Sequence, residues 1–440
     1  MQFARRAAAR TSTMCLFALC VPAIAAGQPP RLPAAAAPNA PLTIDEAVRE
    51  ALDRNLTLLA ERYSVSIAEA RVMAARLRPN PVFTYNAMLP DSAIYDNNIN
   101  PLENVFRTDV IFEGGGKRER RIEVANAAKS VAELQLANTM RTIVLDVQSA
   151  FVDVVLAQAN VALARESLQA FDNLVKVNVE RVRTGDLAPV ELARSRLAAL
   201  QFQNDVRQQE SKLVIAGNRL RTLLGRTGIE PIAISGQLRR DELTMDLPAL
   251  RAQAVRQRPD LEALRLDQAR STADTRLQIA QGKVDFTVSG EYHRQRAPSA
   301  IGNQYGIYVS APIPIFNRNQ GEVERARTEE RQIEAKIHAL DLEVSSDVQT
   351  AYQTCSAARD VMTAVETQML TQARDVRAAT EYSYRRGEAS FVEFLDAVRA
   401  FNETMQSYNE ARADYARRLY TLESATGASV ASLATPRQTP

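Results

Sequence analysis

Residues 140–182 read MRTIVLDVQSAFVDVVLAQANVALARESLQAFDNLVKVNVERV and decide the fold, because apolar side chains recur here at alternating spacings of four and three. The members of this heptad seam are Met140, Val144, Val147, Phe151, Val154, Gln158, Val161, Arg165, Leu168, Asp172, Val175, Val179 and Val182. Such a seam with polar interruptions is typical of coiled-coil packing. Neither proline nor glycine occurs between Gly116 and Arg183, so a helix there would be about 100 Å long. A rod of that length must be packed along its sides by partner helices.

A second copy of this seam lies further along the chain. Its members are Val344, Val348, Ala351, Cys355, Ala358, Met362, Val365, Met369, Gln372, Val376 and Ala379. Cys355 occupies the position equivalent to Phe151, which favours a packing role over a reactive or metal-binding one. Gly185 and Glu191 are likewise matched by Gly387 and Glu393. We therefore expect two copies of one unit, at residues 42–240 and 241–427, followed by a tail at 428–440.

Each unit is expected to contain a helix, a pair of strands, a very long helix, a turn and a further helix. In the first unit the helix runs from about Ile44 to Leu77 and stops before Pro79, which lacks a backbone donor. Side chains then alternate as in strands with one apolar face. The positions on that face are Phe83, Tyr85, Ala87 and Leu89, then Phe106, Thr108, Val110 and Phe112; the second unit has Phe286, Val288, Gly290 and Tyr292, then Ile307, Val309 and Ala311.

The N-terminus resembles an export signal. Arg5, Arg6 and Arg10 precede an apolar run that ends at a small-residue cleavage site before Ala26. We expect a signal peptide at residues 1–25 and an Ala/Pro-rich linker at 26–41. A retained anchor helix is the alternative, but the run is shorter than the ~20 residues that span a bilayer. Lipidation of Cys20 stays open.

No later window is expected to reach the ~20 apolar residues of a membrane helix, so the chain would span a membrane only with strands. Four short strands are too few for a closed barrel, since the smallest have about eight. An open sheet edge in lipid leaves costly unpaired backbone groups. The expected fold class is therefore mainly α, with long coiled-coil helices and a membrane β-barrel in which subunits pool their strands.

Several function classes are excluded by composition. The net charge of +2 gives no indication of a nucleic-acid partner. A metal site needs three or four clustered ligands, whereas the two histidines, His293 and His338, lie far apart and are expected to be solvated. We expect no cofactor, no metal site and no enzymatic activity.

Two other classes of protein would also contain long helices. A periplasmic adaptor has a long helical hairpin, but it is not duplicated from end to end and has a Gly-rich half that this sequence lacks. A coiled-coil scaffold would explain the heptads but not the strand pairs at matching places. Consistency across these levels favours a pore.

The duplicated layout over residues 42–427 resembles the TolC-like outer-membrane factors. The motifs that carry the resemblance are LTIDEA at 42–47, PNP at 79–81, GGGKR at 114–118 and PIPIFNRNQGE at 312–322. They are most similar to the cobalt-zinc-cadmium resistance branch, which serves RND efflux systems. The resemblance implies a homotrimer with a shared twelve-stranded β-barrel in outer-membrane lipid and an α-helical barrel across the periplasm. It also implies two protein partners, a periplasmic adaptor and an inner-membrane RND pump.

The function implied by the resemblance is a passive export duct for metal cations or other small solutes, with a duct for drugs or organic solutes as the alternative. In the family, acidic residues line the periplasmic constriction, and the matching positions here are Glu191, Glu393 and Asp396. The last two are spaced i, i+3 and so share one helical face. A group of such carboxylates from several subunits would favour cations. An ordinary solvated acidic face is the alternative.

The two helix tips are the remaining candidate site. Each has a glycine suited to ending a long helix, and the resemblance places an adaptor there. The docking residues we expect are Arg183, Thr184, Gly185, Arg386 and Gly387. The family archetype has an arginine two residues after the tip glycine, where this chain has Ala389. We expect Tyr384, Arg194 and Arg385 to stabilise the closed gate instead; a capped, solvated turn is the alternative.

Overall fold

The structure is a computed structural model that describes residues 41–88, 102–228, 230, 232–241, 246–297 and 300–427. The predicted signal peptide, the linker as far as residue 40 and the C-terminal tail lie outside the described residues.

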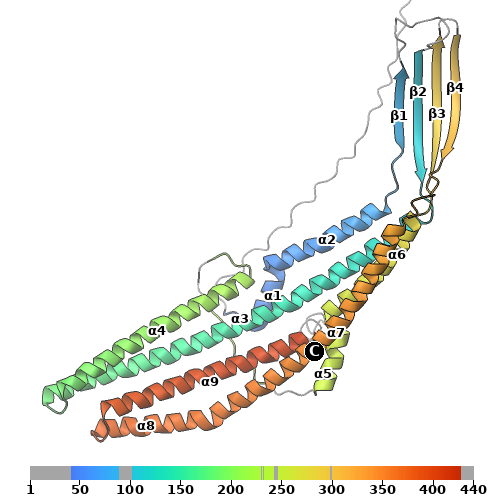
Figure 1. Ribbon diagram of the computed structural model, residues 1–440. Coiled ribbons are helices and arrows are strands. Elements are labelled where there is room, and N and C mark those ends of the chain that lie inside the picture. The colour runs from blue at the N-terminus through green and yellow to red at the C-terminus, as the bar shows by residue number, and fades with distance from the viewer. Residues whose placement is uncertain are drawn as a thin grey trace, which may run out of the picture. The chain divides into compact units, whose positions relative to one another are not determined.

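The same order of elements occurs twice along the chain (Figure 1). The first half has α1 (Ile44–Arg54), α2 (Leu56–Arg76), β1 (Val82–Met88), β2 (Leu102–Phe112), α3 (Lys117–Thr184) and α4 (Pro189–Leu223). The second has α5 (Leu247–Gln257), α6 (Pro259–Gln281), β3 (Phe286–Ala297), β4 (Ala300–Ser310), α7 (Gln320–Ala364), the π-helical turn η1 (Val365–Met369), α8 (Leu370–Arg386) and α9 (Phe391–Ala425). The mainly helical fold class with two strand pairs is confirmed, whereas the repeat boundaries stay a prediction.

The first helix of each half is broken in two, which corrects the single helix expected from Ile44 to Leu77. Asn55 has an extended backbone and ends α1, and its side chain accepts hydrogen bonds from Thr57 N and Leu58 N at the start of α2. Arg258 takes the same place between α5 and α6, where Pro259 is the first helical residue. In both halves the break lets the short helix pack against the long one, α1 against α3 and α5 against α7.

The four strands form one antiparallel sheet in the order β1-β2-β3-β4. Strands from the two halves of the chain meet at its centre, where Phe106 pairs with Tyr292. The strands predicted from the alternation are confirmed, except that β4 ends at Ser310, one residue before the predicted Ala311, and that Leu89 lies outside the described residues. Within the described residues, β1 and β4 each have one edge without a partner strand.

The longest helix, α3, is the element around which the others pack. It contacts α1, α2 and α6 as well as α4 and α9. The predicted seam is buried as far as Val161, except for the half-buried Met140 and Gln158. Further along, Arg165 and Asp172 are exposed, and Ala164 and Phe171 are buried instead. Beyond Val161 the buried positions therefore include Ala164 and Phe171, each one residue before the predicted position. Two of the three predicted polar interruptions, Arg165 and Asp172, lie outside the core.

The second long helix departs from the predicted heptads at η1. Its seam is buried from Val344 to Val365, including Cys355, but Met369 is 50% exposed and Val376 is 55% exposed. Leu370 is buried in place of Met369. A π-helical turn adds one residue to a helical turn and so moves the buried face by one position. The seam predicted beyond Val365 is thus wrong by one residue.

One prediction about membrane helices is also wrong. By length and composition, α3 (Lys117–Thr184) contains a window long and apolar enough to cross a membrane, and 44% of that window is buried inside the structure. The helix packs against five other helices, so core packing accounts for the buried part of this window.

An ion pair and a hydrogen bond connect the start of α3 with the residues that precede β3. Lys117 Nζ lies 2.8 Å from Asp285 Oδ1, which also accepts a hydrogen bond from the Gly114 N–H. Burial alone would raise the pKa of Asp285, but these hydrogen bonds outweigh it and lower the pKa. A Cβ at Gly114 would lie 1.9 Å from the Val284 carbonyl oxygen, so only glycine allows the β2–α3 and α6–β3 connections to approach this closely.

Candidate pore and helix-tip site

One face of the sheet is apolar and exposed. Among its residues Phe83 is 66% exposed, Ile307 is 84% exposed and Val309 is 68% exposed. Aromatic side chains form a continuous row across all four strands on this face, in the order Tyr85, Phe106, Tyr292 and Tyr305. The ring centroids are 4.8, 6.0 and 5.2 Å apart in turn. An apolar band bordered by aromatic residues is typical of the lipid-facing surface of membrane barrels.

The opposite face of the sheet is polar. All the acidic residues of the described strand segments lie on it, as the register shows for Glu103, Asp109 and Glu291. The Arg107 side chain donates to Asp109 and to Ser289. This distribution fits a water-filled interior behind a lipid-facing exterior.

His293 also lies on the polar face and corrects one expectation. Its side chain is only 18% exposed, with Nε2 3.3 Å from Glu103 Oε2, so it is not fully solvated. His338 is exposed, as predicted. No cluster of three or more potential metal ligands occurs in the part of the chain that the structure describes.

The helix tips are the turns between α3 and α4 and between α8 and α9. Gly185 and Gly387 have φ angles of 86° and 77°, the left-handed region that ends helices. The Gly185 N–H donates to Val182 O, and the Gly387 N–H donates to Tyr384 O. An ideal Cβ on Gly387 would lie 4.0 Å from an Arg181 guanidinium nitrogen, so the two tips lie side by side.

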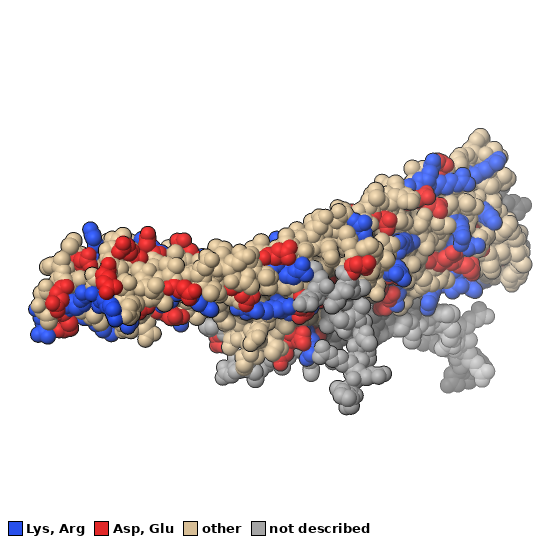
Figure 2. Space-filling view, turned by 90° about the horizontal axis from the view of Figure 1, so that it is seen from below, with Lys and Arg blue, Asp and Glu red and all other residues tan. Residues whose placement is uncertain are grey.

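The predicted docking residues are exposed at these tips. Arg183 forms an ion pair with Glu180, and the Thr184 hydroxyl donates to Asp186. The Arg386 guanidinium lies over the Tyr382 ring, 4.4 Å from its centroid. Figure 2 shows basic and acidic side chains gathered together at this end of the molecule, on its left. The two tips therefore present closely spaced charges of both signs to any protein that docks there.

The predicted constriction residues lie at the start of the helices that follow the tips. Glu393 and Asp396 are exposed on α9. Glu393 forms a capping box, accepting from the Ser390 N–H at 2.7 Å and the Ser390 hydroxyl at 3.0 Å. These hydrogen bonds lower the pKa of Glu393. Glu191 takes the same position on α4, where Ala188 provides no side-chain cap.

Tyr384 is the anchor of an aromatic cluster inside the chain. It is 3% exposed, stacks on Phe394 with 5.2 Å between centroids, and lies edge-on to Phe391. Its hydroxyl is hydrogen-bonded to Asn178 of α3, which is completely buried. Burial raises the pKa of Tyr384. Asn178 was not among the residues predicted from the sequence, although a polar residue beside a predicted heptad seam is a signal for a buried hydrogen bond.

The two predicted gate arginines differ in their surroundings. Arg385 forms an ion pair with Glu381, one turn earlier on α8, at 2.5 Å. Arg194 is exposed and has no ion pair within the described residues. The structure does not bring Arg194 or Arg385 to Glu393 or Asp396 within one chain.

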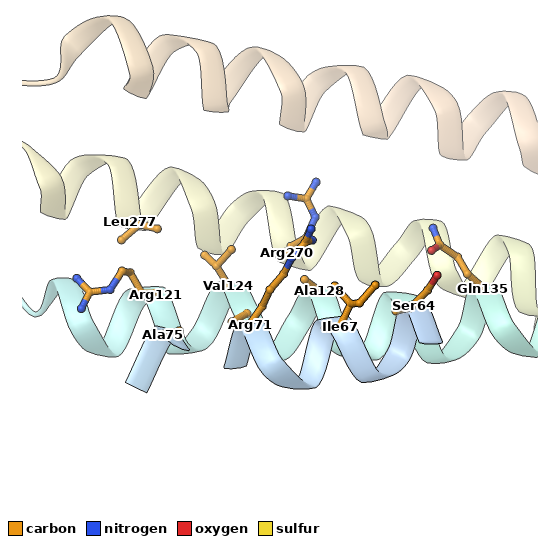
Figure 3. A pocket seen from close by; sticks show the side chains of 13 residues that line it. Ser64, Ile67, Arg71, Ala75, Arg121, Val124, Ala128, Gln135, Arg270 and Leu277 are labelled. Atoms are coloured by element: carbon orange, nitrogen blue, oxygen red, sulfur yellow. The ribbon is translucent and has the colours of Figure 1, made fainter. Parts of the chain in front are cut away.

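A groove of about 640 Å³ lies over α3 between α2 and α6 (Figure 3). Small side chains of α3, among them Ala125, Ala128 and Ala132, form its floor. Its lining contains three arginines but no carboxylate, histidine or cysteine. The Ser64 hydroxyl also lines the groove, but none of the lining residues is a carboxylate or histidine that could serve as its general base.

Comparison with known proteins agrees with this arrangement. Residues 47–226 and 250–428 match the family described as outer membrane efflux protein. The cobalt-zinc-cadmium resistance protein CzcC of Cupriavidus metallidurans is 24% identical over 369 residues, which cover 84% of this chain and 86% of CzcC. A crystal structure of CusC has a TM-score of 0.72 at 18% identity and covers 87% of this chain and 92% of that one. A crystal structure of VceC from Vibrio cholerae has a TM-score of 0.68 at 15% identity, covering 87% and 96%.

Proposed function

Because the chain belongs to the outer membrane efflux protein family, we propose that it forms the outer-membrane channel of a three-part efflux system that exports metal cations. The proposal includes assembly as a homotrimer and docking to a periplasmic adaptor and an inner-membrane RND pump.

The observation that carries the proposal is the open four-stranded sheet. Its apolar face is exposed, and the outer edges of β1 and β4 have no partner strand within the described residues. Each unpaired backbone group in lipid costs several kcal/mol. Pairing β4 of one subunit with β1 of the next would satisfy these edges. Three subunits would close a barrel of twelve strands around the polar face that carries Arg107, Asp109 and Glu291.

At the other end of the pore, we assign the constriction to Glu393, Asp396 and Glu191. The capping box holds the Glu393 carboxylate near the α9 N-terminus and favours its charged form. Carboxylates from three subunits would attract cations and repel anions. Tyr384, Arg194 and Arg385 would stabilise the closed state. The tip residues Arg183, Thr184, Gly185, Arg386 and Gly387 would meet the adaptor.

The cargo is assigned from the metal-resistance relatives rather than from a binding site. CzcC is named for cobalt, zinc and cadmium resistance and CusC as a cation efflux protein. A duct needs no tight site for its cargo, since tight binding would slow release. Transport would be passive, with no chemistry performed on the solute.

Deletion of the gene tests this assignment in the native host. Cells without the protein should accumulate more cobalt, zinc or cadmium and grow poorly in these metals, and the wild-type gene should restore both. The matched control is sensitivity to bulky organic antibiotics, which should change little. The reverse pattern, with unchanged metal content and greater antibiotic sensitivity, would favour the organic-solute duct.

A further inference from the structure

A row of hydrogen-bond donors lies beyond the aromatic row on the apolar face of the sheet. Arg294 of β3 pairs in register with Asn104 of β2 on one side and with Asn303 of β4 on the other. Arg296 follows two residues later on the same face, and both arginines are exposed. The row lies at the strand ends away from the helices, since α3 follows the opposite end of β2.

Two tyrosines of the aromatic row determine which groups the asparagines of the donor row present. The Tyr85 hydroxyl donates to Asn104 Oδ1 at 2.8 Å, and the Tyr292 hydroxyl donates to Asn303 Oδ1 at 2.9 Å. Because both amide oxygens are engaged, the two NH₂ groups remain as donors beside the guanidinium. The row thus presents donors from three adjacent strands.

No acidic side chain lies on this face in the described strand segments. Glu103, Asp109 and Glu291 all lie on the opposite face. Neither Arg294 nor Arg296 forms an ion pair within the described residues, whereas Arg107 on the polar face is paired with Asp109. The positive charge of the row is therefore not neutralised by the sheet.

From this arrangement we propose that Arg294, Arg296, Asn104 and Asn303 bind the phosphate group of a glycolipid in the outer leaflet of the membrane. Aromatic rows of barrels lie at the level where acyl chains meet headgroups. The donor row directly beyond it is at the height of the headgroups. Guanidinium groups bind phosphate through paired hydrogen bonds, and the neighbouring amides supply further donors. The inference rests on the proposed barrel, because only a barrel turns this face to lipid.

Native mass spectrometry of the full-length wild-type assembly in detergent tests the proposal, with diphosphorylated lipid A and its dephosphorylated form as probes. The phosphorylated form should bind at least about tenfold more tightly, since each basic residue near an anionic surface contributes measurably to attraction. Inorganic phosphate in tenfold molar excess should not displace it. Equal binding of the two lipids, or displacement by inorganic phosphate, would overturn the proposal without any variant being needed.

A double variant tests the residues themselves. Arg294→Gln with Arg296→Gln should lose the preference for the phosphorylated lipid, and Arg294→Lys with Arg296→Lys should keep part of it. The matched control is Arg71→Gln with Arg327→Gln, which removes two exposed arginines from the helices and should keep the full preference. Retention of the preference in the Gln double variant would overturn the assignment. The mass of the protein assembly in the same spectra reports separately on the proposed barrel.

Discussion

The Asn178 amide of α3 and the Tyr384 hydroxyl of α8 form a buried hydrogen-bonded pair, 3.1 Å apart, that joins the two halves of the chain near the tips. Asn178→Ala should leave the Tyr384 hydroxyl without a partner among aromatic rings. An unpaired buried hydroxyl costs about 1–3 kcal/mol, so the midpoint of thermal unfolding should fall. The double variant Asn178→Ala with Tyr384→Phe should lose less free energy of unfolding than the sum of the two single changes, because it leaves no unpaired group from this hydrogen bond.

The control for this pair is Tyr382→Phe on the same helix. Tyr382 is 56% exposed, and its ring rather than its hydroxyl contacts Arg386. That change should leave the unfolding midpoint of the protein unaltered. An unchanged midpoint in Asn178→Ala would show that the buried pair does not stabilise the tips.

Neutralising the α9 carboxylates should change ion selectivity. In planar bilayers the wild-type channel should prefer cations, and Glu393→Gln with Asp396→Asn should weaken that preference, since clustered negative charge concentrates cations. Glu403→Gln is the matched control, because Glu403 is an exposed glutamate further along α9. Equal reversal potentials in the double variant and the wild type would show that these carboxylates do not line the pore.

The capping box predicts how selectivity depends on pH. Hydrogen bonds from Ser390 lower the pKa of Glu393 below its ordinary value of 4.5, so the carboxylate stays charged as the pH falls toward that value. Ser390→Ala removes the hydroxyl donor and should move the loss of cation preference to higher pH. It should also destabilise α9 by about 1 kcal/mol through loss of the cap. Any stabilisation from the lowered pKa is present above pH 4.5 and is lost as the pH falls through the folded-state pKa.

The rescue variant for the cap is Ser390→Thr, which keeps a hydroxyl at this position and should restore the wild-type pH profile. A profile that does not move in Ser390→Ala would mean that Glu393 does not control selectivity.

The gate arginines are tested by conductance. Arg194→Ser with Arg385→Ser should raise single-channel conductance and make cells leaky to bulky antibiotics, if the two cations offset repulsion among carboxylates from three subunits. Glu381→Gln distinguishes this effect from a local one, because it breaks the Arg385–Glu381 ion pair within α8 but leaves Arg385 charged. If Glu381→Gln produced the same leak, the effect would come from the intrahelical pair. Wild-type conductance in the double variant would show that Arg194 and Arg385 do not hold the pore closed.

Much of the fold could be predicted because its elements have strong periodic signals. The strands alternate over their whole length, and α3 contains no residue that breaks a helix. The breaks at Asn55 and Arg258 were missed because their signals are local. In the sequence Asn55 is indistinguishable from other polar helix residues. Only the structure shows that its side chain accepts hydrogen bonds from Thr57 N and Leu58 N and so caps α2. Pro259, the first residue of α6, is a recognisable sign of a helix start in the sequence.

The buried faces of the long helices were harder to predict. Ala164 and Arg165 are neighbours, and a seam through either fits an alternation of three and four. In the packed structure Ala164 is buried and Arg165 is exposed. The turn η1 has no strong sequence mark, so the shift from Met369 to Leu370 could not be foreseen. At the site, the tip glycines were predictable from their role in ending helices, whereas the surroundings of Tyr384 depend on side chains distant in sequence.

The mass of the assembly purified from outer membranes in mild detergent tests the central claim most directly. If strands are pooled to close the sheet edges left by β1 and β4, native mass spectrometry should give three times the mass of one processed chain. The same preparation should show both helix and strand by circular dichroism. A stable, monodisperse single chain with its sheet intact would contradict the shared barrel.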